Sequence, residues 1–204
     1  DPWPHVPGPG GLTVFMVWSS VAVFPERPGG AAGDAPAVSP NHWSTTMSGL
    51  RYSQLVEEIL PEVREIWPWD LEEQMEAGED MLIVDLREPY EYDAMHIADS
   101  INCPRGILET AVEWDFEETV PELVQARDRY VVLVCRSGNR SVFGAHMLQR
   151  MGFNNVVSLK TGLRGWNDYE MPLVDEGGDP VTLEEGDAYF ATKLFPEQRD
   201  PARR

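Results

Sequence analysis

The chain has 204 residues and a mass of 23.0 kDa, and 16 basic against 35 acidic side chains give it a formal net charge of −19. A chain this acidic is a poor candidate for binding nucleic acid or an anionic membrane, because both polyanions would repel it. Its length fits one domain with appendages, and 42% hydrophobic residues suffice for a packed core.

The first 46 residues differ in composition from the rest. They hold 8 of the 17 prolines and 6 of the 17 glycines, which is typical of a linker. Their apolar run, residues 12–24, is shorter than the roughly 20 residues that span a bilayer, and no Lys or Arg precedes it as in a signal peptide. We expect residues 1–46 to be a linker-like extension that is dispensable or artefactual, with Met47 as the natural start. The alternative is a strand over residues 14–24 that docks on the domain.

After residue 46 the pattern becomes that of a folded domain. Apolar positions recur at helical spacing in residues 55–60, which predicts an amphipathic helix within residues 47–66. Residues 81–84 (MLIV) and 130–134 (YVVLV) are short, β-rich apolar runs. Such runs are typical of strands that are covered on both faces of a parallel sheet. Residues 156–158 (VVS) predict a further short strand.

Helical patterns alternate with these strands. They cover residues 69–77, 116–126 and 141–151. The alternation predicts an α/β domain over residues 67–175, with a mainly parallel central sheet flanked by helices. Residues 176–204 form an acidic C-terminal tail, in which residues 188–195 have the pattern of one docking helix.

The strand over residues 130–134 runs directly into a cysteine. The segment CRSGNRS begins at Cys135 and precedes the next predicted helix, at the carboxyl edge where such sheets bind ligands. Gly138 and Asn139 tolerate left-handed geometry, so the chain can turn successive N–H groups inward. This cradle, the helix dipole, Arg136 and Arg140 should favour a thiolate. Cys135 is therefore the predicted nucleophile of a covalent-catalysis site.

The same segment resembles the active loop of the rhodanese homology domain, a family of single-domain sulfurtransferases. The resemblance covers about residues 67–174. Residues 85–92 (DLREPYEY) are similar to the family's D-x-R-E-P-x-E-[FY] box. Residues 96–102 (HIADSIN) are similar to its G-H-I-P-G-A-x-N box, with Met95, Ala98 and Asp99 in place of Gly, Pro and Gly. Residues 159–172 resemble its closing L-x-G-G-x-x-x-W…P motif, with Thr161 at the first Gly. The resemblance implies a rhodanese-like α/β fold of three layers.

The resemblance also implies a reaction. Cys135 would accept sulfane sulfur from thiosulfate or a related persulfide donor, become a persulfide, and pass the outer sulfur to a thiol, to cyanide or to a sulfur-carrier protein. No metal or organic cofactor is implied. Asp85 and Arg87 are expected to form a buried ion pair that supports the loop, with a catalytic role as the alternative. The substrate-binding residues would be Arg136, Ser137, Gly138, Asn139 and Arg140.

Two other functions stay open. A rhodanese-like binding or sulfur-relay module would use the fold to recognise a partner protein. A Cys-dependent phosphatase or arsenate reductase would use a similar loop, but phosphatases of this architecture carry Cys-x5-Arg. Cys135 and Arg140 are spaced as Cys-x4-Arg, and no His precedes Cys135, which favours sulfur.

The remaining candidate residues are better explained by structural roles than by catalysis. Cys103 has no comparable setting and is expected to be structural or incidental. We expect His96 to be a hydrogen-bonded turn residue, Trp166 to pack under the sheet edge, and Glu91 to pair with Arg87 or another local base. No His/Cys spacing indicates zinc. Two unpaired thiols and the missing signal features favour the cytoplasm over the periplasm.

The negative charge is unevenly spread. Residues 129–167 contain no Asp or Glu and carry a charge of +6. Because this stretch builds the predicted active loop, we expect a positive pocket that attracts small anions such as thiosulfate.

Overall fold

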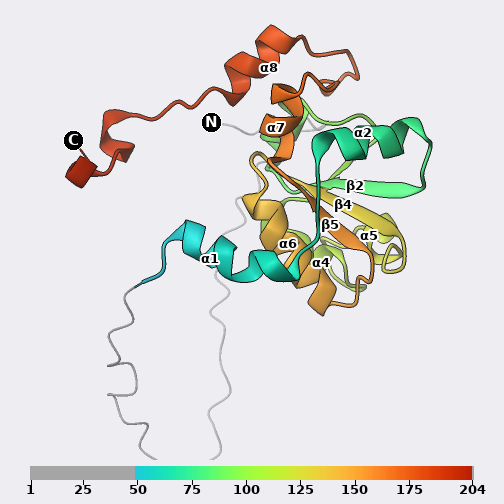
Figure 1. Cartoon of the computed structure of the whole chain (residues 1–204). Coiled ribbons are helices and arrows are strands. Elements are labelled where there is room, and N and C mark those ends of the chain that lie inside the picture. Colours follow the sequence, from blue (N-terminus) through green and yellow to red (C-terminus); the bar gives the residue numbers. More distant parts are fainter. Residues whose placement is uncertain (1–48, 204) are drawn as a thin grey trace, which may run out of the picture. The chain divides into compact units, whose positions relative to one another are not determined.

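Five parallel strands form the sheet of the described part of the chain, in the order β1-β5-β4-β2-β3. Figure 1 labels the central strands β5, β4 and β2. The computed structural model describes residues 49–203. The expected extension over residues 1–46, the start at Met47 and the alternative strand over residues 14–24 lie outside the described residues. The parallel pairing confirms the predicted α/β fold. The strands are β1 (Glu65–Ile66), β2 (Met81–Asp85), β3 (Ile101–Asn102), β4 (Tyr130–Val134) and β5 (Val156–Leu159).

Helices cover both faces of this sheet, which makes it the middle of three layers (Figure 1). One face carries α1 (Tyr52–Ile59), α4 (Leu108–Ala111), α5 (Pro121–Val124) and α6 (Asn139–Arg150). The other face carries α2 (Pro68–Glu76) and α7 (Gly162–Asp168), against which α8 (Leu183–Phe190) packs. Helix α3 (Pro89–Ala94) follows β2, and short 3-10 turns cover Leu60–Glu62, Arg105–Ile107, Pro196–Gln198 and Pro201–Arg203. Every helix within residues 49–203 is too short or too polar to span a bilayer.

The sequence of β4 explains why both faces are covered. Val131 and Leu133 belong to the core cluster on the α6 side, whereas Val132 and Val134 belong to the cluster on the α7 side. All four side chains are buried. Successive side chains of a strand point to opposite faces, so a strand with apolar residues at every position needs a layer on each side. Burying each such side chain contributes about 1.5–3 kcal/mol.

Some elements differ from the sequence predictions. The helix expected over residues 116–126 is reduced to α5, because Pro121 lacks an N–H and starts the helix instead of continuing one. The helix expected over residues 188–195 lies earlier, at α8, where Thr182 and Glu185 form a capping box. Strands β1 and β3 are absent from the predictions, because two residues carry no periodicity.

Candidate active site

Cys135 directly follows β4, and α6 begins four positions later at Asn139. Only 1% of Cys135 is exposed. Gly138 has a φ of +89°, a left-handed conformation that turns the chain from the strand into the helix. In the first turn of α6, the N–H of Ser141 donates to Cys135 Sγ at 3.4 Å. The sulfur therefore lies at the N-terminus of α6, where the helix dipole stabilises negative charge.

The active loop offers further hydrogen-bond donors. Among the residues that the structure describes, the amides of residues 136–140 donate to no group of the protein. The Ser141 hydroxyl lies 3.5 Å from Cys135 Sγ, and it is held at 2.8 Å from both the Gly138 carbonyl and the Ser158 hydroxyl. Both serines are buried. Unpaired amides beside one buried sulfur suit a thiolate or a persulfide anion.

The segment after β5 supports the active loop through its backbone. The N–H of Leu163 donates to the Cys135 carbonyl at 2.8 Å, and the N–H of Arg164 donates to the Arg136 carbonyl at 2.9 Å. Gly162 approaches so closely that a Cβ there would lie 2.3 Å from the Cys135 carbonyl oxygen. Only glycine fits this position.

Two positions at which the resemblance has glycine keep a left-handed backbone without it. Thr161 has a φ of +65° and Asp99 a φ of +61°. Each costs about 1–2 kcal/mol relative to an ordinary helical conformation. The substitutions therefore preserve the geometry of the two turns.

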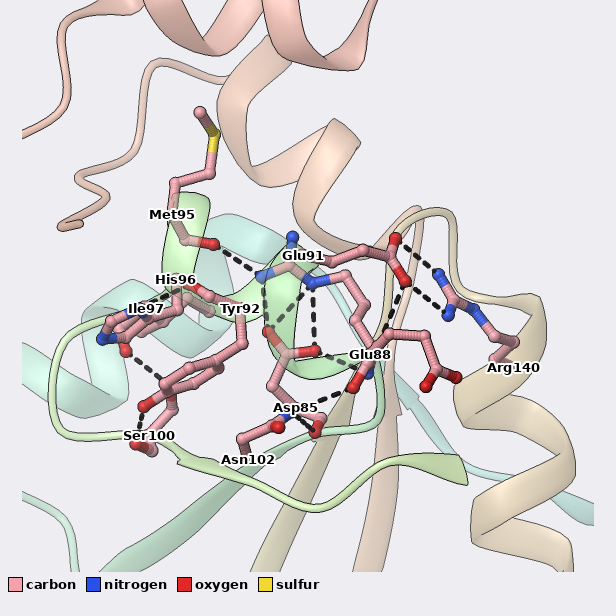
Figure 2. Close-up of polar contacts among 11 residues, drawn as sticks. Asp85, Glu88, Glu91, Tyr92, Met95, His96, Ile97, Ser100, Asn102 and Arg140 are labelled. Atoms are coloured by element: carbon pink, nitrogen blue, oxygen red, sulfur yellow. Dashed lines mark hydrogen bonds and ion pairs between the residues drawn. The ribbon is translucent and has the colours of Figure 1, made fainter. Parts of the chain in front are cut away.

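Arg140 is held by a carboxylate. Its Nη1 and Nη2 donate to the two carboxylate oxygens of Glu91 on α3, at 2.9 and 3.0 Å (Figure 2). Burial would raise the pKa of Glu91, but hydrogen bonds from Arg140 and from the Glu88 N–H hold it below its usual value. The hydrogen bond to Glu91 in turn raises the pKa of Arg140. The prediction of a local partner for Glu91 is wrong, because the pair joins residues 49 positions apart.

Arg136 extends towards α8. Its Nη2 donates to the carbonyl of Phe190 at 2.9 Å. The guanidinium carbon lies 5.3 Å from the centroid of the Phe190 ring and 5.9 Å from that of Tyr189. Within residues 49–203, no acidic side chain forms an ion pair with Arg136. Of the two loop arginines, Arg136 is therefore the one whose charge is not neutralised.

Asp85 and Arg87 form an ion pair at 2.7 Å, and both residues are fully buried. Arg87 also donates to the carbonyl of Met95. The Asn102 side chain donates to the carbonyls of Asp85 (Figure 2) and Arg87. These bonds tie the end of β2 to the segments around α3 and β3. Because neither member bonds to Cys135, the arrangement favours support over catalysis.

Tyr52 on α1 is a neighbour of the site that the sequence did not indicate. Its ring stacks on that of Phe143 in α6, with the two ring centroids 6.0 Å apart. Burial, together with the negative charge of Cys135, raises the pKa of Tyr52. No local signal marks Tyr52, since α1 reaches the active loop only in the folded chain.

The structure also places the residues that were predicted to be structural. Burial raises the pKa of Cys103 to about 11, so this thiol stays protonated. His96 Nδ1 lies 2.9 Å from the Tyr92 carbonyl (Figure 2), and Trp166 is buried and donates to the Pro172 carbonyl at 2.8 Å. Among the described residues, no group of three or more His, Cys, Asp or Glu is placed to hold a metal ion.

Comparison with known proteins links the fold to a family. The family profile described as a rhodanese-like domain matches residues 68–169. A sulfurtransferase from Allochromatium vinosum is 30% identical over 116 residues, which cover 57% of this chain and 99% of that protein. An uncharacterized protein from Synechocystis is 28% identical over 111 residues, which cover 54% of this chain and 56% of that protein. The chain thus spans little more than half the length of the second relative.

One solved structure adds a second comparison. It is a Rhodopseudomonas palustris protein of unknown function, described as a possible tyrosine phosphatase. It matches with a TM-score of 0.55 and 27% identity, over 60% of this chain and 93% of that chain.

Proposed function

Because the chain belongs to the family of rhodanese-like domains, we propose that it is a sulfurtransferase that carries sulfane sulfur on Cys135. The observation that supports this proposal most is the surroundings of the Cys135 sulfur. The sulfur is buried at the end of β4 and accepts a hydrogen bond from the Ser141 N–H. The amides of residues 136–140, which follow it, donate to no group within residues 49–203. Such a site suits an anion that alternates between one sulfur atom and two.

The reaction has two balanced steps. The Cys135 thiolate attacks the outer sulfur of a donor such as thiosulfate, the S–S bond of the donor breaks, and its electron pair leaves with sulfite. Cys135 is then a persulfide. An acceptor thiolate, or cyanide, next attacks the terminal sulfur, the persulfide S–S bond breaks, and its electron pair returns to Cys135 as the thiolate. The products are an acceptor persulfide or thiocyanate, and neither step draws on a metal or organic cofactor.

The surrounding residues have separate roles in this proposal. The amides of the loop and the Ser141 N–H stabilise the negative charge of the thiolate and the persulfide. Arg136 attracts the anionic donor and stabilises the leaving group. Arg140 links the active loop to α3 through its ion pair with Glu91. Asp85 and Arg87 support the neighbouring loops, as described above.

The acceptor in this proposal is a small thiol, cyanide or a sulfur-carrier protein. Both cysteines of the chain are unpaired and buried. Unpaired thiols are typical of a reducing compartment, which favours the cytoplasm over the periplasm as the place of the reaction.

A phosphatase or arsenate reductase is the second candidate, since a protein of similar fold is described as a possible tyrosine phosphatase. The spacing from Cys135 to Arg140 is one residue shorter than in the phosphatases of this architecture. Arg140 also donates both terminal nitrogens to Glu91, so its bidentate face is not available to phosphate. Both observations favour sulfur.

Turnover assays separate the candidates. The sulfurtransferase proposal predicts thiocyanate formation from thiosulfate and cyanide, which Cys135→Ser abolishes and the matched variant Cys103→Ser retains. Hydrolysis of p-nitrophenyl phosphate without thiocyanate formation would support the phosphatase instead. Absence of both activities with every sulfane donor tried would support a binding module.

A further inference from the structure

Helix α8 lies outside the segment that matches the family, which ends at residue 169, yet it contacts the active loop. Its last residue, Phe190, is 2% exposed and belongs to the core cluster that contains Trp166. Asn167 on α7 donates to Asp187 on α8 at 2.8 Å. These contacts fix α8 on the domain.

Arg136 is held by α8 in three ways: by the hydrogen bond to the Phe190 carbonyl and by contacts with the rings of Phe190 and Tyr189. The Phe190 carbonyl belongs to the C-terminal end of α8, which attracts a cation through the helix dipole. A guanidinium that contacts two rings and a carbonyl has lost much of its freedom. Its remaining N–H donors are therefore oriented before a ligand arrives.

Tyr189 lies close to several charged groups around the active loop. Burial raises the pKa of Tyr189, and the charges of Arg87, Glu91 and Arg136 all act on its hydroxyl. These three residues come from the segment after β2, from α3 and from the active loop. The guanidinium carbon of Arg136 lies 5.9 Å from the centroid of the Tyr189 ring, which places Tyr189 beside the active loop.

We propose that α8 belongs to the active site. Tyr189 and Phe190 are positioning residues that hold the Arg136 guanidinium at the edge of the active site, and this cation favours anionic sulfur donors. The proposal rests on the sulfurtransferase function. Without α8, the Arg136 side chain would sample many rotamers in solvent, where its charge is screened. Because Glu91 neutralises Arg140, this loss would not be compensated within the loop.

Two alkylating reagents measure this effect without turnover. Iodoacetate is an anion and iodoacetamide is neutral, and they are of similar size. The ratio of their rates with Cys135 rises when a cation is fixed beside the path of the reagent. We expect Arg136→Ala to lower this ratio about five-fold, as one charge several ångströms away at the protein surface would. Combined Tyr189→Leu and Phe190→Leu changes, which keep apolar volume, should lower it by a similar factor.

Conservative and remote variants provide the controls. Tyr189→Phe keeps the ring and should leave the ratio unchanged. Phe195→Ala removes an exposed aromatic side chain farther along the same tail and should also have no effect. In turnover, the leucine variant should lower kcat/KM for thiosulfate several-fold, because both the attraction of the donor and the stabilisation of the leaving group depend on a positioned Arg136.

A double-mutant cycle gives the decisive comparison. If α8 acts through Arg136, the leucine changes should have no further effect on the ratio in the Arg136→Ala protein. Additive losses, or an unchanged ratio in the folded leucine variant, would overturn the proposal. If the doubly changed protein does not fold, Tyr189→Leu alone supports the same cycle, because Tyr189 is only half buried. Failure of the sulfurtransferase function itself is seen separately, as the absence of a sulfur adduct on the unaltered protein.

Discussion

Replacing Gly162 by alanine tests how closely α7 is fitted to the active loop. Gly162 has a φ of +59°, where a side chain costs about 1–2 kcal/mol. The new Cβ would lie 2.3 Å from the Cys135 carbonyl oxygen, 2.6 Å from the Ser137 nitrogen and 2.7 Å from the Gly138 nitrogen. All three are backbone atoms of the active loop, so either this loop or α7 must move.

The size of the effect follows from the contacts that such a movement breaks. If α7 retreats, the hydrogen bonds from the Leu163 and Arg164 amides to the loop carbonyls are lost. Each contributes about 0.5–1.5 kcal/mol. Together with the backbone conformation, the expected loss in the free energy of unfolding is about 2–5 kcal/mol.

Gly78→Ala is the matched control. Gly78 also has a positive φ, +70°, but a Cβ there would meet nothing within 4 Å. It should therefore lose only the backbone contribution of about 1–2 kcal/mol and keep full activity. Urea unfolding gives both free energies, and the rate of Cys135 alkylation reports the state of the loop. Equal losses for the two variants, with Cys135 alkylation unchanged in Gly162→Ala, would show that α7 is not closely fitted to the active loop.

Three further predictions concern charge and protonation. Because the folded state lowers the pKa of Glu91, its pair with Arg140 stabilises the protein fully above the unfolded value of about 4.3 and loses this effect as pH falls through the folded pKa. Glu91→Gln should therefore cost about 1–2 kcal/mol at pH 7 in urea unfolding and less at pH 3, and an equal cost at both would contradict this. Cys103, with a pKa of about 11, should resist iodoacetamide at pH 8 in folded Cys135→Ser, and modification at the rate of a free thiol would be unexpected. Raising ionic strength should weaken the apparent affinity for thiosulfate in steady-state assays. The absence of a salt effect would argue against a positive charge at the entrance to the active site.

The sheet and its principal helix are largely predictable from local sequence. Residues 81–84 of β2 and the whole of β4 are uninterrupted apolar runs, and α6 shows one buried face at helical spacing. Strands β1 and β3 are different, because each has two residues and exists only by pairing with β5 or β2. The Asp85–Arg87 pair was foreseeable, since its members are two positions apart.

The candidate site likewise has a part that local sequence predicts and a part that depends on the folded chain. The strand, Cys135, Gly138 and the following helix are contiguous, so the chemistry of the loop is visible in the sequence. The partners of its arginines are not, because Glu91 and Phe190 lie 49 and 54 positions from Arg140 and Arg136. Only the folded chain brings α3 and α8 beside the active loop.

The charge around the active loop differs most from the sequence prediction. The basic stretch of residues 129–167 predicts a positive pocket, yet acids from other segments pair with much of it. Glu91 pairs with Arg140, and Glu65 pairs with Lys160. Arg129 pairs with Asp80 and Glu122. A local count of charge overestimates the field at the site, because the fold supplies neutralising groups that the count omits.

Intact-mass spectrometry after incubation with thiosulfate shows most directly whether Cys135 carries sulfane sulfur. Sulfur transfer through Cys135 predicts a gain of one sulfur atom that cyanide removes. Peptide mapping should place this sulfur on Cys135, Cys103→Ser should retain it, and Cys135→Ser should lack it. An adduct that persists in Cys135→Ser, or no adduct from thiosulfate or any persulfide donor, would contradict sulfur transfer through Cys135.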